Sequence, residues 1–181
     1  MAQPTTETGA KGRSAQHQDA VALLKADHRK VEELFESFEK ARGAERKQKL
    51  VEQICLELKV HTVIEEEIFY PACRGKIEED LLDEAYVEHD AAKKLIAELE
   101  ASEPNEEFYD AKVKVLQEEI EHHVEEEEKR TEGMFAQAKK AGLDMDALGE
   151  QLAARKAELT EQFKLSGIPE PKLTTMNEVS V

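Results

Sequence analysis

The sequence is poor in the residues that build β-sheets. Its 181 residues include eight glycines, five prolines, no tryptophan and only 5% aromatic residues. An all-β sandwich needs β-branched and aromatic strands joined by frequent turns, so this composition argues against that fold class. Only two cysteines occur, Cys55 and Cys73, without the paired spacing of a zinc site or a redox motif. We expect both to be reduced and structural.

Basic residues are few relative to acidic ones. Lys and Arg total 25 against 41 Asp and Glu, which gives a formal net charge of −16. Nucleic-acid phosphates are bound by clustered Lys and Arg, so we expect no nucleic-acid partner. Of the acidic residues 33 are Glu, a good helix former, and this choice favours an all-α fold.

Long apolar runs are absent as well. No segment approaches the length of a membrane span, and the first twenty residues lack the apolar centre of a secretory signal. The sequence therefore predicts a cytoplasmic protein with no membrane partner.

Turn-forming residues divide the chain into five segments, and in each of them apolar residues recur at three- and four-residue spacing. The predicted helices cover residues 18–42, 45–70, 77–101, 105–140 and 144–165. Short connections make consecutive helices antiparallel. We therefore predict an all-α protein whose residues 18–140 form an up-down-up-down four-helix bundle.

The segments outside this bundle are more polar. The helix over 144–165 follows a good N-cap residue, Asp144, and is too charged for a bundle core. We expect it to lie outside the bundle or to mediate assembly into a homo-oligomer. Residues 1–17 and 166–181 show no periodicity and are predicted to be disordered tails.

The histidines carry the first functional signal. Six occur, and four of them have a Glu four residues later. On the helix over 45–70 the apolar stripe is centred between His61 and Glu65, so both are predicted to face the core. The neighbouring Glu66 projects about 100° away and is interpreted as a solvated charge.

The helix over 105–140 contains two overlapping pairs. His123 and Glu127 follow its apolar stripe, whereas His122 and Glu126 lie more than about 100° away from it. The first pair is therefore predicted to face inward and the second to face solvent.

Two further histidines complete an inward-facing set. His28 lies near the edge of the first apolar stripe, and His89 lies on the inner side of the third helix. Two buried carboxylates are very costly unless they are paired or bind a metal, and no Lys or Arg shares these stripes. Four imidazoles and two carboxylates are ligands for two metal ions, although a polar core network is the alternative. Mixed N and O ligands suit iron, manganese or zinc, and open positions on a redox-active pair favour two Fe ions.

Four sequence patterns resemble the hemerythrin-like HHE cation-binding domain over about residues 18–140. They are DHRKVEELF, HTVIEEEIFYP, EAYVEHDAAKKLI and EHHVEEEE. The resemblance implies a four-helix bundle that holds a non-haem di-iron centre, bridged by two carboxylates and able to bind dioxygen or nitric oxide. The ligands carried over are His28, His61, Glu65, His89, His123 and Glu127.

The sequence departs from this pattern in two places. Oxygen-carrying hemerythrins have a second histidine one turn after the third-helix ligand, and here that residue is Lys93. A water could replace it, or another side chain, of which Tyr86 and Glu88 are nearest in sequence. A more open iron should react more readily with oxygen or peroxide, so simple oxygen carriage is not expected. The proline that usually follows the fourth-helix motif is also missing, which predicts a longer helix there.

Three functions remain open from the sequence. The first is a di-iron protein that binds dioxygen or nitric oxide, or responds to oxidative or nitrosative stress. The second is a di-iron enzyme that decomposes peroxide or oxidises iron. The third is an interaction module in which the metal is only structural.

Overall fold

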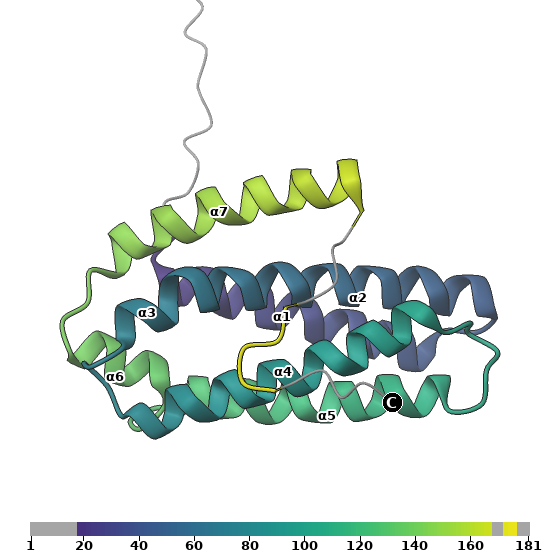
Figure 1. The fold of residues 1–181 in the computed structure, drawn as a ribbon, viewed down its shortest axis with the longest axis horizontal. Coiled ribbons are helices and arrows are strands. Elements are labelled where there is room, and N and C mark those ends of the chain that lie inside the picture. The colour runs from purple at the N-terminus through teal and green to yellow at the C-terminus, as the bar shows by residue number, and fades with distance from the viewer. Residues whose placement is uncertain (1–17, 168–171, 177–181) are drawn as a thin grey trace, which may run out of the picture.

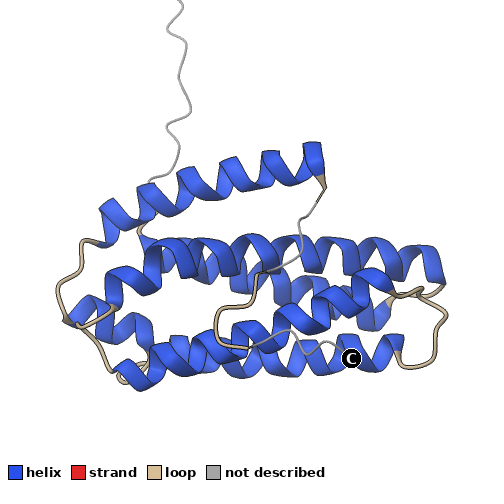
Figure 2. Ribbon diagram, viewed as in Figure 1, coloured by secondary structure: helices blue, strands red, loops and turns tan. Residues whose placement is uncertain are grey.

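Four long helices form the body of the protein. The computed structural model describes residues 18–167 and 172–176. The described residues include no strand, and the long helices pack as an antiparallel bundle (Figure 1; Figure 2). These helices are α1 (Ala20–Lys40), α2 (Ala44–Ile64), α4 (Glu79–Ala101) and α5 (Tyr109–Glu128). The predicted all-α, up-down-up-down four-helix bundle is confirmed.

Local sequence sets where the first helices begin. The Asp19 side chain accepts a hydrogen bond from the Ala22 backbone N–H at 2.8 Å, which caps the start of α1. Gly43 then turns the chain into α2 with φ of +84°, a conformation that other residues rarely adopt. Because this connection is so short, α2 runs back along α1.

The second helix changes its hydrogen-bonding pattern near its end. Residues Glu65–Phe69 form a π-helix, η1, and one α-helical turn follows as α3 (Tyr70–Cys73). Pro71 has no N–H, and its ring would clash with the carbonyl four residues earlier in a regular α-helix. The Tyr70 N–H instead donates to the Glu65 carbonyl, five residues back. Residues five apart therefore align on one face at this point.

The predicted long fourth helix is wrong. Helix α5 ends at Glu128, and a separate short helix, α6 (Met134–Lys140), follows it. Between them the Gly133 N–H donates to the Lys129 carbonyl at 3.1 Å. A Cβ atom on Gly133 would lie 2.6 Å from that carbonyl oxygen, so only glycine fits this tight return of the chain. The turn therefore depends on one glycine rather than on a proline.

Helix α7 (Met145–Ser166) lies outside the bundle, as predicted, and contacts α1, α2 and η1 (Figure 1). The Asp144 side chain accepts from the Ala147 N–H at 3.0 Å and caps its start. Its large apolar side chains from Leu148 to Phe163, including Leu152, are buried against its own chain, whereas Leu165 near its end is exposed. The face through which we expected self-association is therefore covered within one chain, and a homo-oligomer stays a prediction.

The apolar core is divided into two clusters along the bundle. One contains Leu24, Phe69 and Leu152, and the other contains Phe35 and Ile54. Buried polar residues, including His28 one turn after Leu24, lie in the sequence between the members of the two clusters. The functional side chains are thus enclosed by apolar packing at both ends.

The structure describes part of only one of the two segments predicted to be disordered tails. Residues 1–17 lie outside the described part of the chain. Of the predicted tail over 166–181, residues 172–176 are described and make hydrogen bonds to Asp90, which the lack of periodicity did not predict. Among the described residues, no helix is both long and apolar enough to span a membrane.

Candidate metal centre

The structure brings together all six side chains that the sequence predicted as ligands. Each is buried, with an exposed fraction of 6% or less. They come from the four bundle helices and from η1, and they lie between the two apolar clusters. They are His28, His61, Glu65, His89, His123 and Glu127.

One half of this centre is formed by α1, the end of α2, and α5. His28 Nε2 lies 3.1 Å from His61 Nε2, and His61 Nε2 lies 3.1 Å from Glu65 Oε2. Glu127 Oε2 completes the group at 3.4 Å from His28 Nε2. Four donor atoms, one from each residue, lie within 4.8 Å of one another, a spacing that one metal ion could span.

The other half is formed around α4 and α5. His89 Nε2 lies 3.2 Å from His123 Nε2 and 3.4 Å from Glu65 Oε2. Glu127 Oε2 lies 3.8 Å from His123 Nε2. Glu65 belongs to both groups and Glu127 lies close to both, so each carboxylate is placed to bridge two ions.

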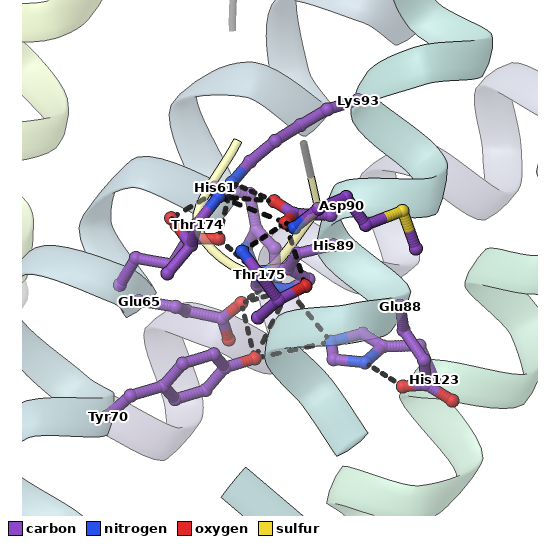
Figure 3. A network of polar contacts seen from close by, with 12 residues as sticks. His61, Glu65, Tyr70, Glu88, His89, Asp90, Lys93, His123, Thr174 and Thr175 are labelled. Atoms are coloured by element: carbon purple, nitrogen blue, oxygen red, sulfur yellow. Dashed lines mark hydrogen bonds and ion pairs between the residues drawn. The ribbon is translucent and has the colours of Figure 1, made fainter. Parts of the chain in front are cut away.

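Tyr70 supplies a further oxygen to this second half, which the sequence analysis did not predict. Its hydroxyl lies 3.1 Å from both His89 Nε2 and Glu127 Oε1, and 3.5 Å from His123 Nε2. Figure 3 shows Tyr70 beside Glu65 and His123. The π-helix aligns Tyr70 with Glu65, to which the hydroxyl is 3.4 Å distant. Burial, together with the nearby Glu127 and Glu65 carboxylates, raises the pKa of Tyr70 well above its usual value.

The two replacements predicted for the missing third-helix histidine lie elsewhere. The Tyr86 ring packs edge-on against the Tyr70 ring, with centroids 5.3 Å apart. Glu88 Oε2 lies 2.8 Å from His123 Nδ1, the nitrogen that faces away from the centre. A constant angle of 100° per residue does not predict that Tyr70 faces the centre, because the π-helix changes that angle. Pro71 was the sequence signal that the helix is altered here.

Three imidazoles hold their orientation through a carboxylate at the outer nitrogen. The Nδ1 atoms of His28 and His123 lie 2.8 Å from Glu128 and Glu88, respectively. Such a contact keeps the proton on Nδ1 and leaves the Nε2 lone pair directed inward, as a metal ligand requires.

Glu66 performs this role for His89, so its interpretation as a solvated charge is wrong. Its Oε1 atom lies 3.1 Å from His89 Nδ1, and its side chain is 16% exposed. His61 is held more loosely, because its Nδ1 lies 3.6 Å from Asp27 Oδ2, beyond hydrogen-bond distance.

Without a metal, protons compensate the buried carboxylates. Burial favours neutral His61, but the Glu65 carboxylate and the Asp27 side chain outweigh it and raise the pKa of His61 to about 10. Burial favours protonated Glu65, yet the neighbouring His61 and His89 hold its pKa well below the usual value. A cation entering the centre would therefore displace protons from imidazole.

The donor set fits two cations. Among the described residues, Glu65 Oε1 and Glu127 Oε2 are buried atoms without a hydrogen-bond partner. Within the same part of the chain, the ion pairs of these two carboxylates are with histidines, and the buried Lys93 contacts Glu66 and Asp90 instead. Buried carboxylate oxygens surrounded by imidazole nitrogens are characteristic of a metal centre.

The outward-facing pair behaves as predicted. The side chain of His122 is 59% exposed, and its Nε2 lies 3.5 Å from Glu88 Oε1. Glu126 forms an ion pair with Lys129. Neither residue contributes to the buried groups.

Both cysteines are buried and unpaired, as expected for structural residues. Burial raises the pKa of Cys55 and of Cys73 to about 12. Each thiol therefore stays protonated near neutral pH.

Two comparisons with known proteins describe similarity of sequence and of fold. The chain is 28% identical over 117 residues to a DNA nickase from Nostoc sp., a match that covers 65% of this chain and 33% of the nickase. It therefore spans about a third of that relative's length. The crystal structure of a hemerythrin HHE cation binding domain-containing protein from Mycobacterium kansasii matches with a TM-score of 0.72 and 23% identity, over 83% of this chain and 95% of that one. At this identity the match shows a shared fold.

The family itself is shown by sequence. The model of the hemerythrin HHE cation binding domain matches residues 19–135, well over half of the chain. The matched range contains all six buried donor residues and the His/Glu groups that fit a metal site. The chain therefore belongs to the hemerythrin HHE cation-binding domain family.

Proposed function

We propose that this protein holds two iron ions between its bundle helices. The first ion would be held by His28 and His61, the second by His89 and His123, with Glu65 and Glu127 between them. The observation that carries this proposal is the pair of buried donor groups that share Glu65. Manganese or zinc is a weaker candidate, because open positions on a redox-active pair favour iron.

We infer that the centre binds dioxygen or nitric oxide, or takes part in a response to oxidative or nitrosative stress. Bound iron would supply open coordination positions and redox chemistry for these small molecules. The chain's own contribution is to exclude water with the two apolar clusters and to hold imidazole lone pairs inward. A cytoplasmic location stays a prediction.

Elemental analysis and absorption spectra test this function. Protein expressed with iron should contain about two irons per chain and show a near-ultraviolet iron band that changes with dioxygen or nitric oxide. His61→Ala should lower the iron content, whereas His122→Ala, which changes an exposed histidine, should not. Protein that holds only zinc, or no metal at all, would contradict the proposal.

Peroxide decomposition is a second candidate, and the position of Tyr70 favours it. The Tyr70 hydroxyl lies 3.1 Å from His89 Nε2 and donates to Glu127 Oε1 at 3.1 Å. A phenol there could donate a hydrogen bond to a peroxide oxygen, while the bound iron would supply the electrons for cleavage of the O–O bond. Oxidation of iron by the same centre is the related alternative.

Peroxide consumption per bound iron separates this enzyme from a simple binding protein. Wild-type protein should consume peroxide faster than an equal amount of free iron, and Glu65→Ala should lose the excess rate. A wild-type rate equal to that of free iron would exclude an enzyme that decomposes peroxide.

We do not extend the relative's nickase activity to this chain. The match covers only 33% of that protein. The net charge of −16 would also repel a phosphate backbone.

A further inference from the structure

A short C-terminal segment packs against α4 beside the second half of the centre. We call residues 172–176 the C-terminal strap. Within it the Thr174 and Met176 backbone N–H groups donate to the Asp90 carboxylate at 2.9 Å, and the Thr175 N–H donates at 2.5 Å. The Thr175 hydroxyl adds a fourth bond at 2.9 Å. Asp90 is fully buried under these contacts.

The strap is connected to a predicted metal ligand through side chains. The Thr174 hydroxyl donates to Glu66 Oε2 at 3.2 Å, and the other oxygen of Glu66 lies 3.1 Å from His89 Nδ1. Figure 3 shows Thr174 and Thr175 of the strap beside Asp90. Lys93 donates to Glu66 at 2.7 Å and to Asp90 at 3.1 Å. Asp90, Lys93 and Glu66 therefore form a continuous network between the strap and His89.

The network contains more negative than positive charge. Two carboxylates, Glu66 and Asp90, share the single ammonium of Lys93. The backbone N–H groups of the strap satisfy Asp90, so that Lys93 can make its shorter contact with Glu66. Without the strap Asp90 would be left with Lys93 as its partner in this network, and the two carboxylates would compete for it.

Within the described residues, His89 is the predicted ligand that contacts this network. In the first half Glu128, which contacts His28, is held by Lys25 and Arg29, and Asp27 is held by Lys156. The strap also covers part of a cavity of about 620 Å³, to whose walls Leu173, Thr174, Glu66 and Lys93 contribute. Loss of the strap would therefore expose the outer side of Glu66 and leave the supports of His28 and His61 in place.

We propose that the C-terminal strap positions the second half-site, acting through Asp90, Lys93 and Glu66 on His89. The proposal rests on the metal centre described above, but not on iron as the metal or on any reaction. Asp90, Thr174 and Thr175 are positioning residues, and none of them is placed to touch a bound ion.

Zinc release to a chromogenic chelator tests the metal side of this proposal. Full-length protein loaded with zinc is compared with Asp90→Asn and with a chain lacking residues 172–181. Asp80→Asn, an exposed aspartate on the same helix, and deletion of residues 177–181 alone serve as matched controls. We expect one of two zinc ions to leave about tenfold faster in both test variants, as for other changes to groups that support metal ligands. The controls should match wild type.

Trypsin cleavage after Lys172 in the metal-free protein tests the strap itself. Lys172 is exposed, but residues 174–176 after it are held to Asp90. Release of the strap should let this segment extend into the protease, so Asp90→Asn should be cleaved at least several-fold faster than Asp80→Asn. Equal cleavage in the two variants, or zinc release at the wild-type rate from both test variants, would overturn the proposal. If wild type binds zinc but not iron, the proposed function fails and the strap is still tested.

Discussion

Each predicted ligand histidine presents Nε2 to the interior and Nδ1 to a carboxylate, and the quality of the outer contact varies. His28 and His123 have outer contacts of 2.8 Å, whereas the corresponding distance for His61 is 3.6 Å. A long contact restrains the ring less. We therefore regard His61 as the ligand with most freedom to adjust when a cation enters.

Removal of the Tyr70 hydroxyl tests whether this residue acts in chemistry or only in packing. Tyr70→Phe keeps the buried ring, so iron content should stay near wild type and stability should fall by only about 1 kcal/mol. Peroxide consumption per iron should fall at least about tenfold, because the only phenol proton near His89 and Glu127 among the described residues is lost.

Tyr86→Phe is the matched control for this experiment. Tyr86 packs against the Tyr70 ring without reaching the centre. Equal loss of rate in the two variants, measured at equal iron content, would show that the Tyr70 hydroxyl has no special role.

The cysteines give a pH-dependent prediction. Raised pKa values of about 12 leave Cys55 and Cys73 almost entirely protonated at pH 8, and the reactive thiolate increases only as pH rises toward 12. In the folded protein alkylation by iodoacetamide at pH 8 should be slower by roughly a thousandfold or more than in urea, as followed by mass spectrometry. Fast labelling of native Cys73 would instead support a redox-sensing role.

Phase arithmetic predicted that the six donor side chains face inward because five of them lie in regular α-helices. The sixth, Glu65, is the first residue of η1 and directly follows α2. Phase arithmetic failed for Glu66 and Tyr70, which lie within or next to η1. There the hydrogen-bonding register shifts by one residue, and an angle of 100° per residue no longer applies. Contacts such as Glu128 with His28, 100 residues apart, also depend on tertiary packing that one sequence does not encode locally.

At the scale of helices, the predictions succeeded where apolar periodicity was strong and failed at their ends. Apolar residues at three- and four-residue spacing correctly predicted each of the four bundle helices. The end of α5 depended on Gly133, whose backbone approaches Lys129 too closely for any side chain. That requirement is a property of the folded turn, and a glycine in an acidic stretch does not reveal it.

Helix α7 offers a test in which two effects have opposite signs. Gly→Ala inside an exposed helix stabilises by about 0.5–1 kcal/mol. At Gly149, however, a Cβ atom would lie 2.3 Å from the Gln18 carbonyl oxygen and 2.9 Å from the Ala20 nitrogen. We expect Gly149→Ala to lower the free energy of unfolding by about 1–3 kcal/mol, because α7 must move away from the start of α1.

Urea unfolding of Gly149→Ala measures this effect. Ala153→Gly changes an exposed position of the same helix. It measures the difference in helix propensity between Ala and Gly alone, and it should lower the free energy of unfolding by about 1 kcal/mol. A Gly149→Ala protein more stable than wild type would mean that α7 does not dock closely on α1.

For the whole molecule, the arrangement of polar and apolar layers decides how stability depends on metal. The two apolar clusters contain no metal ligand, and the buried polar residues between them include Glu65 and Glu127, so we expect the clusters to hold the bundle together without metal. Chelation should therefore leave the helix content, seen by far-ultraviolet circular dichroism, nearly unchanged. The thermal unfolding midpoint should fall, because metal binding to the native state is linked to stability.

Restoration of metal supplies the control for chelation. The midpoint should recover on addition of iron or zinc to wild type and should not recover in Glu65→Ala. A midpoint that chelation leaves unchanged would indicate that the centre is a polar network of the core rather than a metal site.

The first half-site combines His28 from the first bundle helix with Glu127 from the last, and this has a consequence for connectivity. An ion held by His28 and Glu127 would join α1 to α5 and close a loop of about 100 residues, much as a covalent cross-link would. In the chain-entropy model, closure of such a loop is worth about 4.7 kcal/mol. A chain cut between α4 and α5 should therefore remain one particle while metal is bound, and its two fragments should separate more readily after chelation.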